Sequence, residues 1–316
     1  MIGPSVTYRD LTTLEDYAQV VELERRIWGP GYGEVVPVPI LAVSVLRGGI
    51  LIGAFTRETA RAFAPSALRR GSPKLVETAS DRTRDDSAER MVGFVYSLPG
   101  IKHGKATQWS HMLGVVAEHR NDGTGRRLKL LQRERALAMG LELIEWTYDP
   151  MQALNAHLNF AKLGVVVEEY EENVYGTSSS PLHKGNPTDR FVAEWWIAKP
   201  HVERRLQSGV AVTLRSDEVA DAPTANRATP GRDWHACEEV NLALDARRVR
   251  VEIPMHFTEM LSGAPEQALE WRLATREIFR TYFGRGYRAV DFFLDRPGGK
   301  GSYLLAQGEG TRRLGD

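Results

Sequence analysis

The sequence predicts an α+β fold, in which a mixed sheet is flanked by helices and is followed by a smaller C-terminal α/β unit. Short runs rich in Val, Ile, Phe, Tyr and Trp alternate with longer segments whose apolar residues recur at helical spacing. Pro200 then separates a first set of elements from a second set that repeats a strand–helix–strand order. We therefore divide the chain into units 1–200 and 201–316. The second unit is either a degenerate half-repeat of the first or ordinary β-α-β structure.

The first unit begins with a strand and two helices. Thr12 or Thr13 can cap the first helix, because a hydroxyl there accepts a hydrogen bond from an N–H of the first turn. Two apolar runs joined by a short turn predict a hairpin, and Gly164 is the expected cap of the last helix. The predicted elements are strand 6–9, helix 14–28, helix 40–46, strand 48–55, strands 90–100 and 106–116, helix 126–140, strand 141–149, helix 151–164, and strands 165–176 and 190–198.

Two further regions complete this pattern. Residues 57–90 hold many Arg, Asp, Ser and Thr residues and few large apolar ones, so we expect a long surface loop. The second unit contains a strongly amphipathic helix between strands. Its predicted elements are strand 247–254, helix 265–287, and strands 288–295 and 302–308.

Composition restricts the class of protein. The chain of 316 residues carries 41 basic and 41 acidic side chains, a balance that gives no support to a nucleic-acid partner. One cysteine, Cys237, excludes an intrachain disulfide and a cysteine-rich metal site, and we expect no bound metal. The polar N-terminus lacks a signal sequence, and no apolar run approaches the roughly 20 residues that span a bilayer. We therefore expect a cytoplasmic protein without a membrane partner; whether it is a monomer or a homodimer stays open.

The segment 118–127 reads EHRNDGTGRR and stands between a predicted strand and a predicted helix. The first N–H groups of a helix lack partners, and with the helix dipole they attract an anion. Gly123 and Gly125 place no Cβ in the way of a diphosphate, while Arg120 and Arg126 add positive charge. An ordinary turn with a basic rim is the alternative. The spacing is neither that of a dinucleotide-binding fingerprint nor that of a P-loop.

These residues, with their neighbours, resemble the GNAT superfamily of acyl-CoA N-acyltransferases. The resemblance rests on Arg-x-x-Gly-x-Gly after LGVV, on TQWSHMLGVV and LELIEWTYDP as two central strands, and on the helix NAHLNFAKLG. It covers roughly residues 5–198. It is strongest to a group of predicted acetyltransferases that share SHM, WTYDP, NAHLN, YG and TDR and carry a C-terminal extension. A GNAT-like acyltransferase fold, plus the C-terminal unit, is therefore expected.

The resemblance also implies where acetyl-CoA or another acyl-CoA binds. In the family, two central strands splay apart, and the pantetheine of the cofactor pairs with the freed backbone. The positions that match the cofactor-binding residues are Val115, Val116, Arg120, Asn121, Asp122, Gly123, Thr124, Gly125, Arg126 and Asn155. Asp122 departs from the family, which has glycine or a basic residue there. An acidic side chain is unfavourable beside a phosphate unless it points to solvent.

Acyl transfer to an amine needs a group that takes the amine proton. Many family members use a glutamate on the fourth strand, where this chain offers His111, whose ordinary pKa suits a base near neutrality. A histidine that only hydrogen-bonds a neighbouring strand is the alternative. Phe160 replaces the family's tyrosine acid. Substitutes for that acid are Tyr148, Tyr170 and Tyr175, each of which can instead be a packing residue.

Charged residues near the ends of two strands are candidates for substrate binding. Asp149 can orient a base or bind the substrate amine, or it can cap the following helix. Arg190 can hold a substrate carboxylate as a bidentate clamp, although a surface salt bridge with a neighbour is the alternative.

The sequence therefore predicts an N-acetyltransferase that moves an acetyl or other short acyl group from coenzyme A to a small-molecule amine or amino acid. An N-succinyltransferase acting on amino acids is a second hypothesis, which would need a basic residue near the thiol end of the cofactor. Two non-catalytic hypotheses also stay open, namely a CoA-binding sensor and a protein-interaction scaffold.

Overall fold

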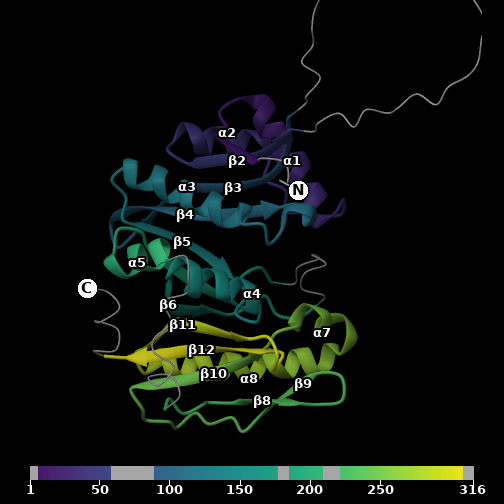
Figure 1. Cartoon of the computed structure of the whole chain (residues 1–316), viewed down its shortest axis with the longest axis vertical. Coiled ribbons are helices and arrows are strands. Elements are labelled where there is room, and N and C mark those ends of the chain that lie inside the picture. The colour runs from purple at the N-terminus through teal and green to yellow at the C-terminus, as the bar shows by residue number, and fades with distance from the viewer. Residues whose placement is uncertain (1–5, 58–88, 177–184, 209–220, 309–316) are drawn as a thin grey trace, which may run out of the picture.

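The structure is a computed structural model that describes residues 6–57, 89–176, 185–208 and 221–308. The surface loop predicted at 57–90 lies outside these residues except at its two ends. In the described part, ten strands form one sheet in the order β1-β2-β3-β4-β5-β7-β6-β11-β12-β10 (Figure 1). Neighbouring strands are antiparallel except for β4 and β5, which are parallel. The sheet is therefore mixed, and the predicted α+β class is confirmed.

The strands of this sheet follow the predicted order along the chain. Their bounds are β1 Val6–Asp10, β2 Ile50–Arg57, β3 Glu89–Lys102, β4 Lys105–Val115, β5 Leu143–Tyr148, β6 Val166–Glu171, β7 Arg190–Trp196, β10 Arg248–Pro254, β11 Tyr287–Asp295 and β12 Lys300–Gln307. A separate hairpin comprises β8 Arg227–Pro230 and β9 His235–Glu238.

Helices cover this sheet. They are α1 Leu14–Trp28, α2 Val38–Leu46, the 3-10 turn η1 Ala117–His119, α3 Thr124–Ala138, α4 Ala153–Ala156, the π-helix η2 His157–Leu163, α5 Pro200–Ser208, α7 Phe257–Gly263 and α8 Pro265–Gly284. The predicted cap of α1 is Thr13, whose hydroxyl accepts from the Asp16 N–H at 3.1 Å, while the Asp16 carboxylate accepts from the Thr13 N–H at 3.2 Å. This reciprocal pair is a capping box, so it fixes where α1 begins.

The helix predicted at 151–164 differs from a single α-helix. Only Ala153–Ala156 is α-helical, and the next two turns are the wider π-helix. The carbonyl of Phe160 accepts hydrogen bonds from Gly164 N–H at 3.1 Å and from the Arg205 guanidinium at 2.9 Å. The second contact comes from α5, a partner that local apolar spacing does not reveal. Gly164 ends the segment at a φ of 76°, as expected for a left-handed glycine cap.

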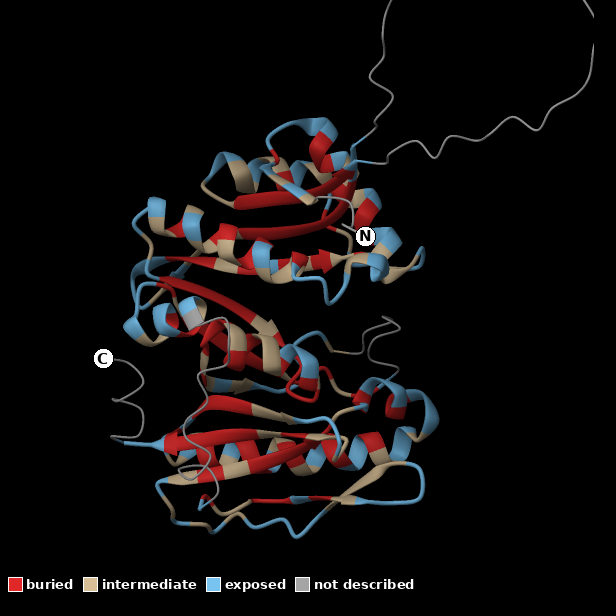
Figure 2. Ribbon diagram, in the orientation of Figure 1, coloured by how far each residue is buried: buried red, intermediate tan, exposed pale blue. Residues whose placement is uncertain are grey.

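The C-terminal unit extends the sheet of the first unit rather than forming a sheet of its own. Strand β11 pairs with β6 through Ala289 and Val167, and the main hydrophobic core runs through both units (Figure 2). Asp291 of β11 also receives two hydrogen bonds, at 3.2 and 2.7 Å, from Arg205 of α5. Both side chains of this ion pair are buried, and the same Arg205 guanidinium donates to the Phe160 carbonyl of the first unit, so Arg205 links the added strand β11 to the first unit.

Replacing Asp291 with alanine leaves the buried Arg205 guanidinium without this carboxylate. We expect the free energy of unfolding to fall by about 3 kcal/mol, as for other buried pairs broken from one side. Urea unfolding followed by circular dichroism measures it. Glu134→Ala is the matched control, because it breaks an exposed pair with Arg127 and is expected to cost less than about 0.5 kcal/mol. Equal losses in the two variants would contradict the role of the buried pair.

Candidate functional site

The site is built where the parallel strands β4 and β5 separate. They pair only through Gln108 with Ile144 and Trp109 with Glu145. From Ser110 onward β4 keeps its pairing with β3, while β5 pairs with β7 on its other side. The two strands therefore diverge (Figure 1). Within the described part of the chain, the edge of β4 that faces β5 carries backbone N–H and C=O groups with no strand beside them.

His111 lies at the start of this open edge. Ser110 pairs with Ser97 and Met112 with Tyr96, so His111 is the extra residue of a β-bulge. Its ring stands edge-on to the Tyr96 ring at 5.9 Å. The side chain is exposed to solvent, yet partial loss of hydration lowers the pKa of His111 below its ordinary 6.5, against the opposing effect of the nearby Glu34 carboxylate. Burial along β4 alternates through this bulge, so the exposed His111 stands between the buried Ser110 and Met112.

The predicted anion-binding loop joins the end of β4 to α3. Gly123 precedes the helix at a φ of 95°, a conformation that favours glycine. The first turn leaves the N–H groups of Thr124, Gly125 and Arg126 without an acceptor within the helix. Asp122, whose acidity was unexpected for a phosphate loop, accepts from Thr124 N–H at 2.8 Å and contacts His119 at 3.0 Å. Asp122 thus caps the helix and leaves the next two N–H groups for a ligand.

The other predicted cofactor residues are spread around this loop. Arg120 donates to the Val115 carbonyl at 3.1 Å, and Arg126 donates to the Leu206 carbonyl of α5 at 3.2 Å. The remaining ones differ in exposure: Asn121 and Asn155 are exposed, Val115 is half-buried, and Val116 is buried. None of these placements tests whether the residues bind a cofactor.

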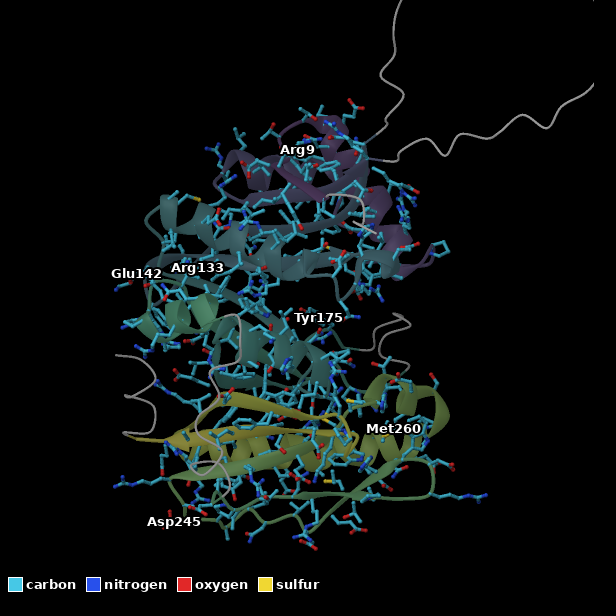
Figure 3. The ribbon with its side chains drawn as sticks, viewed as in Figure 1. Arg9, Arg133, Glu142, Tyr175, Asp245 and Met260 are labelled. Carbon is cyan, nitrogen blue, oxygen red and sulfur yellow. The ribbon has the colours of Figure 1, made fainter. Side chains whose placement is uncertain are left out.

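A second group of side chains faces the diverging strands from the loop between α1 and α2 and from the segment after β6. The hydroxyl of Tyr175, which is labelled in Figure 3, lies 2.9 Å from that of Thr147 on β5. The Arg190 guanidinium lies 5.0 Å from the Tyr175 ring centroid. Burial, together with the charge of Glu34, raises the pKa of Tyr32 to about 12, and Tyr175 is also a neighbour of that ring. Tyr32 and Glu34 were not predicted, because their loop carries only Gly and Pro break signals.

Tyr148 and Asp149 point away from this group, into the interface with the C-terminal unit. The buried Tyr148 hydroxyl lies 3.4 Å from that of Tyr303, and burial raises its pKa well above 10. Asp149 receives two hydrogen bonds of 2.7 Å from Arg272 of α8 and one of 2.9 Å from Met151 N–H. Burial opposes its ionisation, but Arg272 outweighs that effect and holds the pKa of Asp149 below the ordinary value. The side chains of these two candidates, at the end of β5, are therefore engaged by Tyr303 and Arg272 of the C-terminal unit.

Phe160 and Tyr170 are also packing residues. Phe160 is fully buried and meets the Tyr303 ring at 5.7 Å. The Tyr170 hydroxyl donates to Asp189 at 2.5 Å. Of the predicted acid substitutes, Tyr175 alone faces the diverging strands.

Lys129 is a buried polar residue that the sequence did not single out. It lies on α3, and its ammonium donates to Ser110 at 2.8 Å and to Gln132 at 3.2 Å. It also stands 3.6 Å from the Trp146 ring centroid. Burial lowers the pKa of Lys129 to about 7. Since Ser110 and Trp146 each follow the last paired residues of β4 and β5, Lys129 marks the point where the strands separate.

Glu24 of α1 is a fully buried carboxyl group. One oxygen accepts from Val36 N–H at 2.9 Å, and the other has no hydrogen-bond partner among the described residues. Burial raises the pKa of Glu24 to about 7, despite the Val36 N–H and the charge of Arg25. This contact anchors the end of the α1–α2 loop that carries Tyr32 and Glu34. A glutamate at an apolar position of α1 is the signal that could have identified it.

The described residues lack both a metal-binding cluster and a membrane-spanning helix. They contain no group of three or more His, Cys, Asp or Glu side chains arranged to hold a metal ion. None of their helices has the length and apolar character needed to cross a membrane.

No protein family and no curated protein matches the chain by sequence. An acetyltransferase of the GNAT family from Streptococcus pneumoniae is similar in structure over 60% of this chain and 98% of its own, at 15% identity and a TM-score of 0.41. Arabidopsis thaliana NAA60, solved with a bisubstrate analogue, is similar over 61% of this chain and 99% of its own, at 12% identity and a TM-score of 0.41. The PaiA N-acetyltransferase from Thermoplasma acidophilum, solved with coenzyme A, is similar over 60% of this chain and 98% of its own, at 15% identity and a TM-score of 0.36. These similarities concern the fold alone and about 60% of the chain.

The raised pKa of Glu24 predicts how the free energy of unfolding changes with pH. The folded protein holds this proton up to about pH 7, whereas the ordinary value is 4.5. The stabilisation from this group is therefore complete below pH 4.5 and is lost as the pH rises through 7. Glu24→Gln keeps an acceptor for Val36 N–H but cannot ionise. We expect it to become more stable relative to wild type between pH 5 and pH 8, by on the order of 2 kcal/mol.

Urea unfolding at the two pH values measures this difference. Glu22→Gln is the matched control, since Glu22 lies on the same helix with its side chain 78% exposed. A difference between Glu24→Gln and wild type that stays constant over this range would show that Glu24 does not titrate there.

Proposed function

We propose that this protein is an acyl-CoA-dependent N-acyltransferase, which transfers an acetyl or other short acyl group to the amine of a small molecule. The observation that carries the proposal is the open edge of β4 from Ser110 to Val115, which the segment 116–123 joins to the N-terminus of α3. An extended amide chain can pair with such an edge, while a diphosphate at its end meets the N–H groups and dipole of the helix. Pantetheine linked to a diphosphate has this combination of groups.

Cofactor contacts on this proposal follow the open edge and the loop. At the pantetheine end the Val115 carbonyl accepts from Arg120, and the Val116 N–H and carbonyl are bonded to Val92 and His119, so the pairing group there is the Val115 N–H. The N–H groups of Gly125 and Arg126 face the diphosphate. The other loop residues, Arg120, Asn121, Asp122, Gly123 and Thr124, shape the turn, and Asn155 lies on the helix that follows β5.

In the reaction, the acceptor nitrogen attacks the thioester carbonyl. The new C–N bond forms, the C–S bond breaks, and the thiolate takes a proton from solvent. His111 is the proposed base that removes the amine proton, since its lowered pKa leaves it neutral near pH 7. The acceptor side is bounded by Tyr32, Glu34 and Tyr175, where a carboxylate and aromatic rings suit a cationic amine. Arg190, beside Tyr175, is the proposed contact for an acceptor carboxylate.

A second candidate is transfer of an acyl group that ends in a carboxylate, such as succinyl. The observation that favours it is Lys129, a buried ammonium where β4 and β5 separate, whose hydrogen-bond partners Ser110 and Gln132 are both uncharged. A carboxylate would pair with such a group. Comparing kcat/KM for succinyl-CoA and acetyl-CoA with one acceptor decides between the two chains.

Calorimetric titration with acetyl-CoA tests cofactor binding. We expect Gly125→Ala to fold normally, because a Cβ there would meet Val115 at 3.7 Å and Leu113 at 3.9 Å, both ordinary contacts. A methyl group beside the N–H donors should nonetheless weaken acetyl-CoA binding about tenfold, which is about 1.4 kcal/mol. Glu134→Ala, on the same helix, is the control with unchanged affinity. Absence of binding to the wild type at high micromolar acetyl-CoA would reject the proposed function.

Turnover tests the role of His111. We expect His111→Ala to lower kcat about 100-fold and to leave the affinity for acetyl-CoA unchanged. In the wild type, kcat/KM should rise with pH up to a plateau, with a midpoint below 6.5, because kcat/KM reports the ionisation of the free enzyme and protonated His111 cannot accept the amine proton. The variant should lack this rise. Turnover that is equal in the two proteins would exclude His111 as the base.

A further inference from the structure

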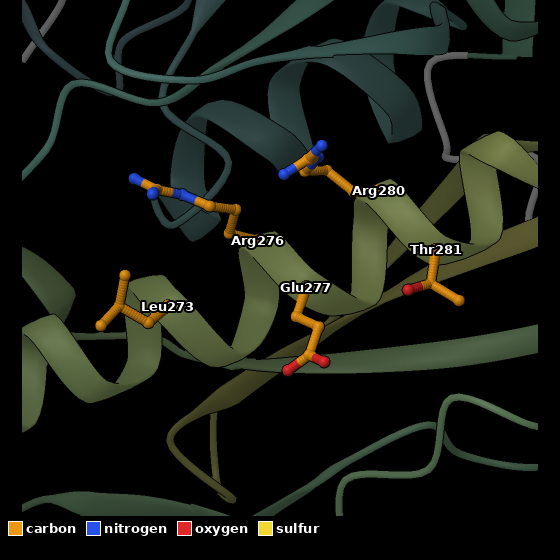
Figure 4. A pocket seen from close by; sticks show the side chains of 5 residues that line it. All are labelled: Leu273, Arg276, Glu277, Arg280 and Thr281. Atoms are coloured by element: carbon orange, nitrogen blue, oxygen red, sulfur yellow. The ribbon is translucent and has the colours of Figure 1, made fainter.

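Helix α8 presents a row of arginines to the first unit. Arg272, Arg276 and Arg280 are four residues apart and lie on one face of the helix. Figure 4 shows Arg276 and Arg280 on the same side of α8, opposite Glu277, in a shallow pocket lined by α8 alone. The three arginines pair with acidic residues of three different segments of the first unit, namely Asp149 after β5, Asp189 before β7, and Glu172 after β6.

The central pair, Arg276 with Asp189, has two matched hydrogen bonds of 2.8 Å. Asp189 is completely buried, and its carboxylate also accepts from the Tyr170 hydroxyl and, at 3.0 Å, from Asn173 N–H. The planar guanidinium fork fixes both oxygens of a carboxylate, which a lysine ammonium cannot do. Arg276 therefore sets the orientation of Asp189, and through it the position of Asn173.

Asn173 begins the turn that carries Tyr175. Its φ of 47° is uncommon for a residue other than glycine. Thr188, the neighbour of Asp189, completes the turn, because its carbonyl accepts from Val174 N–H at 3.2 Å and its hydroxyl accepts from Tyr175 N–H at 2.9 Å. The backbone from 173 to 175 is thus held by the two residues 188 and 189, and Asp189 is itself held by α8.

Tyr175 then projects from this turn to the diverging strands. Its side chain is 47% exposed, and its hydroxyl meets Thr147 of β5 at 2.9 Å. We propose that Arg276 is a positioning residue for the acceptor side of the site, acting through Asp189 and the 173–175 turn on Tyr175. This inference rests on the proposed function. It gives the C-terminal unit a part in acceptor binding, which it performs without touching the acceptor.

Arg276→Lys tests the inference, since it keeps the charge and removes the fork. Arg276 also pairs with Glu172 at 3.2 Å, and Glu172 is shared with Arg280. The matched control is therefore Arg288→Lys, since Arg288 of β11 pairs with Glu168 of β6 at 3.0 Å. The steady-state probes are acetyl-CoA with L-phenylalanine and with tryptamine. Both are primary alkylamines that carry an aromatic ring, and only L-phenylalanine also carries a carboxylate. Hydrogen–deuterium exchange of the 173–175 amides reports the turn directly and needs no acceptor.

For Arg276→Lys we expect about a tenfold higher KM for the acceptor, with kcat and the affinity for acetyl-CoA within twofold of wild type. Exchange should be faster at 173–175 and unchanged in β4. Combining Arg276→Lys with Tyr175→Phe should cost little more than Tyr175→Phe alone, because both changes act on one contact. Arg288→Lys should match wild type throughout.

Unchanged exchange at 173–175 in Arg276→Lys overturns the positioning role, whichever amines are acylated. The same conclusion follows if kcat and both KM values change together, since that is the result of a general loss of structure. A wild-type protein that neither binds acetyl-CoA nor acylates an amine instead rejects the proposed function, and the positioning role with it. That failure appears before any variant is measured.

Discussion

The short parallel contact between β4 and β5 is the constraint on which the rest of the site depends. Because only two residue pairs join the strands, the edge of β4 beyond Trp109 is left open in the middle of the described sheet. Unpaired backbone groups inside a fold are costly unless something hydrogen-bonds to them. The backbone groups of this edge therefore need a ligand or solvent as hydrogen-bond partner. The segment 116–123 joins the edge to the N-terminus of α3.

Buried ionisable groups surround this opening. Lys129 stands where the strands separate and Glu24 lies under the α1–α2 loop, each with a pKa moved to about 7 by burial. Such groups lower stability, and proteins commonly retain them where function uses them. Glu24 anchors the loop that carries Tyr32 and Glu34. The loss of stability from burying Glu24 is therefore linked to the position of the proposed acceptor side. Lys129, at the inner end of the same opening, carries a positive charge below pH 7 and is neutral above it.

The C-terminal unit is joined to this site through the sheet and through guanidinium–carboxylate pairs. Buried pairs of this kind contribute little net stability, because desolvation offsets most of the attraction. Their two parallel hydrogen bonds nevertheless fix the relative orientation of the two side chains. Asp149 and Asp189 stand at the ends of the two strands that flank the acceptor side, and both are held from α8. We infer that the unit acts on the site mainly by fixing positions, which explains why its strands continue the same sheet.

Local features of the site could be predicted from the sequence, whereas its long-range partners could not. Helix spacing, strand runs, the Thr13 cap and the glycine-containing loop before α3 depend on neighbouring residues, so the sequence determined the α+β class, the hairpin of β3 and β4, and the loop. The directions of Tyr148 and Asp149 depend on Arg272, which is 123 residues away from Asp149 in the chain. The bulge at His111 and the junction of β6 with β11 likewise depend on pairing between distant segments, and the Phe160 carbonyl in the π-helix accepts from the distant Arg205. Only the tertiary structure decided these features, because a side chain's environment is set by the segments that pack against it.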